Sequence, residues 1–168
     1  MLEASATSLT GKVALVTGAA SGTTMVTAWQ TITADVVQYN IVAANNSYQG
    51  YALSDPLGGV QMALDSAVLI GDLLVTAIAG NNPAGAPWGQ CCVNGLAVGA
   101  VEPDSHYVVD YSGRGPQIAS PRRDYPDISG CTHTISAAAD CETVGVGLNG
   151  TSAAGPQVAG AAALVRSV

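Results

Sequence analysis

A serine at the start of a helix of small residues is the feature of this sequence with the clearest chemical potential. The segment NGTSAAGPQVAGAAALV, residues 149–165, runs from a Gly-Thr-Ser turn directly into an apolar helix. Backbone N–H groups at a helix N-terminus point outward and favour negative charge. Ser152 could therefore attack a carbonyl, and the resulting oxyanion would meet backbone donors. The alternative is that Ser152 or Thr151 is only an N-cap, which needs no chemistry.

Asn81 is a candidate for the second half of such a site. It follows the apolar stretch 72–79 in the segment AIAGNN. An amide donor at this point could face the reacting carbonyl together with the backbone N–H of Ser152. Losing a donor of this kind typically costs ~10²–10³ in turnover. The alternative is a turn residue that precedes Pro83.

Apolar strands that alternate with helices must position these two residues. This alternation predicts an α/β fold with a mostly parallel sheet and helices on both faces. Ligand groups in such sheets gather beyond the carboxyl ends of the strands, where the polar clusters 45–47 and 80–82 and Ser152 all fall. We expect strands over 12–17, 36–44, 72–79, 95–101 and 144–148, helices over 23–34, 60–70 and 152–166, and a Gly- and Pro-rich region over 103–130.

Size and charge narrow the classes of function. The chain has 168 residues, which fits a single domain over 1–168. Its formal net charge is −7 and its only lysine is Lys12, so a nucleic-acid surface is excluded. No apolar run reaches the roughly 18–20 residues of a membrane span, and no signal-peptide pattern opens the chain.

The cysteines do not indicate a metal site. No CxxC or HxxxH pair occurs, and the acidic residues lack a calcium-loop pattern. We therefore expect no metal and no cofactor. Cys131 and Cys141 flank a short loop and are the most plausible disulfide, whereas the adjacent Cys91 and Cys92 could hardly pair without strain. The alternative is that all the cysteines are thiols.

Several segments together resemble the subtilisin-like serine peptidases. Residues 149–165 are similar to that family's nucleophile segment, GTS-x-A-x-P-x-VAG-x-AAL, and the Asn81 segment is similar to its AAGN. Further similar segments, in the family's order, are VVQYNIVAANNSYQG (36–50), LAVGAVEPD (96–104), DYSGRGP (110–116) and RRDYPDISG (122–130). The resemblance covers about residues 25–168. It implies a truncated three-layer subtilisin-like fold and peptide-bond hydrolysis, with Ser152 as nucleophile and Asn81 as oxyanion donor.

The resemblance also implies where a peptide or protein substrate would bind. Ser47, Tyr48 and Gln49 would border the S1 pocket and offer backbone groups to an extended peptide. Tyr48 and Gln49 are larger than the small residues often found there. Members of the family are often secreted, so the resemblance suggests an extracellular location.

The sequence departs from the family in the rest of the catalytic triad. The family order is Asp, His, Ser, but no HGTHVAG-like segment occurs, and His106 and His133 both follow Asn81. Thr17 occupies the place of the aspartate if the first strand corresponds. Removing triad members costs on the order of 10⁶ in turnover. We therefore expect weak or no activity alone, with Asp and His supplied by a complementing chain or a homo-oligomer. The alternative is an inactive scaffold or assembly module.

The front of the chain carries a second, weaker resemblance. Residues 9–22, LTGKVALVTGAASG, resemble the opening of short-chain dehydrogenases, which would imply a dinucleotide binder. The last glycine of that motif is replaced by Thr24, and the catalytic Tyr-x-x-x-Lys is impossible because Lys12 is the only lysine. We therefore divide the domain into a divergent or recombined front, 1–22, and a subtilisin-like body, 23–168.

Overall fold

The computed structural model describes residues 12–16, 22–48, 58–83, 93–105, 107–115, 125–135 and 148–166. Strands and helices alternate along the first half of the chain. The elements are β1 (Lys12–Val16), α1 (Gly22–Tyr39), β2 (Ile41–Asn46), α2 (Gly59–Leu69), β3 (Leu74–Ile78), β4 (Leu96–Val101), β5 (Ile128–Cys131) and α3 (Thr151–Arg166).

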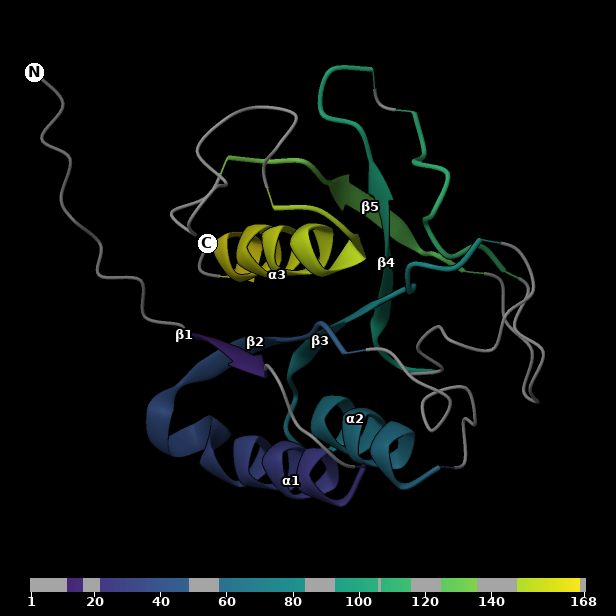
Figure 1. The fold of residues 1–168 in the computed structure, drawn as a ribbon. Coiled ribbons are helices and arrows are strands. Elements are labelled where there is room, and N and C mark those ends of the chain that lie inside the picture. The colour runs from purple at the N-terminus through teal and green to yellow at the C-terminus, as the bar shows by residue number, and fades with distance from the viewer. Residues whose placement is uncertain are drawn as a thin grey trace, which may run out of the picture.

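The strands form one parallel sheet between two layers of helix. The sheet has five strands in the order β1-β2-β3-β4-β5, and every neighbouring pair is parallel. Figure 1 shows α1 and α2 on one face of the sheet and α3 on the other. The predicted α/β class, with a parallel sheet covered on both faces, is confirmed. Because all the strands run in one direction, their carboxyl ends meet at one edge, where the site residues lie.

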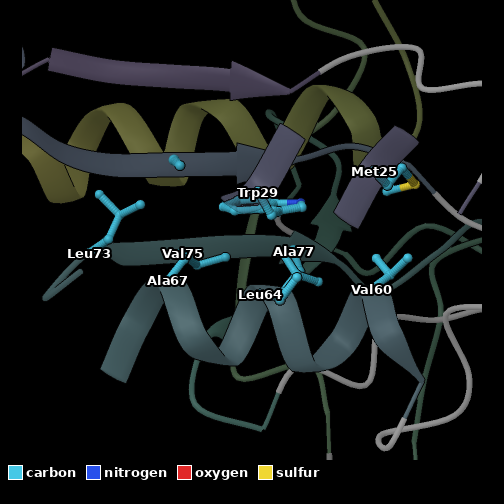
Figure 2. Close-up of a cluster of buried hydrophobic side chains, with 10 residues drawn as sticks. Met25, Trp29, Val60, Leu64, Ala67, Leu73, Val75 and Ala77 are labelled. Carbon is cyan, nitrogen blue, oxygen red and sulfur yellow. The ribbon is translucent and has the colours of Figure 1, made fainter. Parts of the chain in front are cut away.

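The main core lies between the sheet and the α1–α2 layer. Trp29 and Met25 of α1 and Leu64 of α2 are fully buried there. Figure 2 shows Leu64 and Ala67 directed from α2 toward the β3 side chains, with Trp29 beside them. None of the described helices is long and apolar enough to cross a membrane.

A second set of contacts fixes α3 on the opposite face. Thr76 of β3 donates its hydroxyl hydrogen to Asn45 Oδ1 at 3.0 Å, and both side chains are fully buried. Gly155 of α3 lies against this pair, so closely that a Cβ added there would sit 2.5 Å from Asn45 Oδ1. The absence of a side chain at position 155 therefore lets the helix approach the polar centre of the sheet.

This packing predicts opposite effects for two glycines of the same helix. Gly155→Ala is expected to lower the free energy of unfolding by about 1–3 kcal/mol, because Asn45 cannot move away. Gly160→Ala is the matched control, since a Cβ added there meets nothing within 4 Å. It should raise the free energy of unfolding by about 0.5–1 kcal/mol, through helix propensity. Urea denaturation of both variants measures the difference, and equal effects would contradict this packing.

The structure corrects the predicted elements at two places, the start of the second strand and the Gly- and Pro-rich region. The strand predicted over 36–44 is the end of α1 followed by β2, because Ile32 and Val36 continue the helical spacing and pack against the core cluster. Asn40, at φ 51°, turns the chain between the two elements. The region 103–130 also contains most of β5, which the sequence analysis missed. Of the strand predicted over 144–148, only Leu148 is described, in a single antiparallel bridge to Thr134.

Candidate active site

Ser152 lies at the junction between α3 and the carboxyl end of β2. α3 begins at Thr151, directly after Gly150, whose φ is +85°. The Ser152 hydroxyl donates to the carbonyl oxygen of Ser47 at 3.2 Å, and the Ser47 hydroxyl donates to the carbonyl oxygen of Ser152 at the same distance. Asn45 Nδ2 in turn donates to Ser47 Oγ at 2.8 Å. Both serines are half-buried.

Asn81 lies at the carboxyl end of β3, beside the same turn. Its Oδ1 accepts hydrogen bonds from the backbone N–H and from the hydroxyl of Thr151, both at 2.8 Å. A Cβ added at Gly150 would sit 3.1 Å from Asn81 Nδ2. Thr151 therefore fixes the oxygen end of the Asn81 amide, and the whole amide lies against Gly150 in the turn that leads into Ser152.

The structure thus brings together the residues predicted as nucleophile and oxyanion donor. Thr151, the residue between Gly150 and Ser152, makes the link. A small pocket of about 260 Å³ adjoins it and is lined by Asn81, Tyr111, Asn149 and Gly150. Thr151 was considered from the sequence only as a possible N-cap, and no role was predicted for Tyr111. Both lie inside segments that carry the resemblance, the GTS motif and DYSGRGP (110–116), but neither segment indicates the contacts that these side chains make.

The residues predicted to border a substrate pocket have different surroundings. Ser47 contacts Ser152 directly, as described above. Tyr48 is partly buried and packs against the core cluster of α1, α2 and β3. Gln49 lies outside the described residues.

The histidine that the structure describes is held on the β5 side of α3. His133 Nδ1 donates to the Glu102 carboxylate at 3.0 Å. Its ring meets the Tyr111 ring edge to face, with centroids 6.3 Å apart. The Ser152 hydroxyl instead has its hydrogen bond on the β2 side. His106, the other histidine, and Thr17, which would stand in the place of the triad aspartate, lie outside the described residues.

α3 is tied to β5 by the side chain of Gln157. Its Nε2 donates to the carbonyl oxygens of Cys131 and Ala153, both at 2.9 Å. Cys131 is a free thiol in the part of the chain that the structure describes, and Cys141, its predicted disulfide partner, lies outside that part. In the described ranges, no group of three or more His, Cys, Asp or Glu side chains could hold a metal ion.

A larger hollow lies away from Ser152. It measures about 650 Å³ and lies between α1 and α2, on the face of the sheet opposite to α3. Its lining is mainly apolar and uncharged: Val26, Gln30, Thr33, Ala34, Gly59, Met62, Ala63, Ser66 and Ile70. Size alone therefore does not identify the reactive site in this chain.

Comparison with solved structures finds the same fold in maturation proteases. PatG, the patellamide maturation protease, superposes with a TM-score of 0.59 at 20% identity, over 87% of this chain and 42% of PatG. PagA, the prenylagaramide maturation protease, superposes with a TM-score of 0.61 at 21% sequence identity, over 90% of this chain and 52% of PagA. The self-cleaved protease domain of PatA superposes with a TM-score of 0.59 at 26% sequence identity, over 85% of this chain and 51% of the PatA chain. This chain therefore spans about half the length of the proteins it resembles.

A comparison with family models and with curated proteins completes the assignment. No curated protein matches this chain. The model of the subtilase family matches residues 7–168, which include both the Ser152 segment and most of the front that the sequence analysis set apart. On a match that covers nearly the whole sequence, this chain belongs to the subtilase family of peptidases.

Proposed function

We propose that Ser152 and Asn81 form the nucleophile and oxyanion half of a serine peptidase site. The observation that carries this proposal is the double hydrogen bond from Thr151 to Asn81 Oδ1. A side-chain amide whose oxygen already accepts two hydrogen bonds is held in one orientation, which also fixes the direction of its N–H₂ group. Such a preorganised donor costs no reorganisation when charge develops on a substrate oxygen.

The proposal assigns peptides as the substrate class. The end of β2 brings Ser47 beside Ser152, so an extended peptide there would expose its backbone to the nucleophile. Tyr48 and Gln49 follow Ser47 and would border the pocket for the side chain that precedes the cleaved bond. A related solved structure, the PatG macrocyclase, is a complex with a peptide, which supports this substrate class.

Activity of the chain alone is expected to be weak. Ser152 donates its hydroxyl hydrogen to the Ser47 carbonyl, which cannot serve as a general base. His133 follows β5, and β3 and β4 separate that strand from β2, where the Ser152 hydroxyl has its hydrogen bond. Without an Asp–His pair, an oxyanion hole and binding leave about 10³ of acceleration over water. We propose that a complementing chain or a second copy supplies that pair.

Labelling with a fluorophosphonate probe tests the nucleophile. We expect slow labelling of the wild type that accelerates when imidazole is added as an external base, and loss of labelling in Ser152→Ala. Ser66→Ala is the matched control, because Ser66 is also a helix serine whose hydroxyl donates to a carbonyl, that of Met62 at 2.7 Å. This variant should label like the wild type. Intact-mass spectrometry and peptide mapping measure the modified fraction.

The competing function is a catalytically inactive scaffold or assembly module. The hydrogen bond that occupies the Ser152 hydroxyl is the observation that favours it. It predicts no labelling at any imidazole concentration, or labelling that persists in Ser152→Ala. Either result would overturn the peptidase proposal.

A further inference from the structure

The Tyr111 hydroxyl joins the turn before Ser152 to the end of β5. Tyr111 Oη accepts a hydrogen bond from the backbone N–H of Gly150 at 3.1 Å. The same oxygen shares a 2.8 Å hydrogen bond with Thr132 Oγ1. Gly150 and Thr132 are both buried and Tyr111 is half-buried, so these bonds are partly shielded from competition with water.

The ring of Tyr111 is also held in place. It is half-buried, and its edge-to-face partner His133 is itself fixed by the Glu102 carboxylate. Tyr111 also lines the small pocket that Asn81, Asn149 and Gly150 complete. Tyr111 is therefore fixed by β5 and by the segment after β4, and it contacts the turn that carries the reactive residues.

We propose that Tyr111 is a positioning residue for the nucleophile turn, an inference that rests on the function proposed above. Gly150 adopts a φ of +85°, and its N–H points to the Tyr111 hydroxyl rather than into a helix. The next residue, Thr151, directs two hydrogen bonds at Asn81, and the residue after that is Ser152. A shift of Gly150 would therefore change the Asn81 orientation and the Ser152 position together.

Tyr111→Phe tests this inference because it removes the hydroxyl and leaves the ring. We expect the Gly150 amide to exchange with solvent deuterium about tenfold faster, in line with the loss of one intramolecular hydrogen bond. Amides in the α1–α2 core should keep their protection. Tyr107→Phe is the matched control, because Tyr107 is 76% exposed and lies outside the Asn81 pocket. It should leave the exchange of Gly150 unchanged.

A second pair of variants separates the effect of the Tyr111 hydroxyl hydrogen bonds from the effect of packing around the ring. Thr132→Val removes the other hydrogen-bond partner of Tyr111 Oη and should also speed the exchange of the Gly150 amide. Thr132→Ser keeps a hydroxyl at this position, so the Gly150 amide should exchange at the wild-type rate. In fluorophosphonate labelling, Tyr111→Phe should lower the maximal labelling rate constant several-fold and leave the half-saturating probe concentration unchanged. A purely structural role would change neither quantity for the folded fraction.

Two results would overturn the inference. One is unchanged Gly150 exchange in Tyr111→Phe, and the other is an equal loss of protection at every amide, which would indicate global destabilisation alone. The exchange measurement does not need a reactive serine. If the wild type fails to label at all, the peptidase proposal is overturned, while the Gly150 exchange still decides the role of Tyr111.

Discussion

Asn81→Asp is expected to lower the Ser152-dependent hydrolysis of an activated ester by about 10²–10³-fold while the fold is kept. The substitution keeps an oxygen that can accept the two hydrogen bonds from Thr151. It removes the N–H₂ donor and places a carboxylate beside a developing oxyanion. The effect should be large because, without a general base in place, the residual acceleration depends on the oxyanion donors.

The control for Asn81→Asp is the same change at the next residue. Asn82→Asp adds the same charge at an exposed position and should leave the ester rate near that of the wild type. Both variants should melt within a few degrees of the wild type, and initial rates corrected for Ser152→Ala measure the effect. An Asn81→Asp variant with wild-type activity would contradict the assignment of Asn81 as oxyanion donor.

Asn81→Ala separates the two ends of the amide. It removes the donor and also leaves the buried Thr151 without its acceptor, which costs about 1–3 kcal/mol. The ester rate should fall as in Asn81→Asp, but only Asn81→Ala should lower the melting temperature. A melting temperature equal to that of the wild type in Asn81→Ala would show that the Thr151 hydrogen bonds do not stabilise the turn.

The sheet was predictable from sequence where the strands are buried on both faces. Stretches such as 72–79 and 95–101 are mostly apolar, and both correspond to central strands, β3 and β4. β5 was missed because its sequence ISGC is short, polar and half exposed, so it resembles the loop around it. The start of β2 was misplaced because Val36 is β-branched, yet it packs as part of a helix.

For the site, the sequence predicted which residues lie at one edge of the sheet, but not how their side chains are oriented. Parallel strands bring their carboxyl ends together, which places Ser47, Asn81 and Ser152 near one another without knowledge of any side chain. The contacts that orient them depend on tertiary packing. The Tyr111–Gly150 hydrogen bond joins positions 39 residues apart, and the segment DYSGRGP around Tyr111 does not indicate its partner. Sequence therefore indicated the chemistry but not the groups that fix its geometry.

Trp29→Ala is expected to lower the free energy of unfolding by about 3–5 kcal/mol. Trp29 is fully buried and is among the largest side chains of the core cluster between α1, α2 and the sheet. Its removal leaves a cavity that neighbours such as Leu64 cannot fill without leaving their own contacts (Figure 2). Native domains are stable by only about 5–15 kcal/mol, so this loss should be visible as a much lower urea midpoint.

Gln30→Ala is the control for Trp29→Ala, because Gln30 is the adjacent residue of α1 and is exposed. It should change the free energy of unfolding by no more than about 0.5 kcal/mol. Trp29 lies on the face of the sheet opposite to α3, whereas Ser152 lies on α3 itself. Trp29→Ala should therefore lower Ser152 labelling only in proportion to the unfolded fraction. A labelling loss larger than that fraction would show that the core also sets the geometry of the nucleophile turn, and an unchanged urea midpoint would contradict the burial of Trp29.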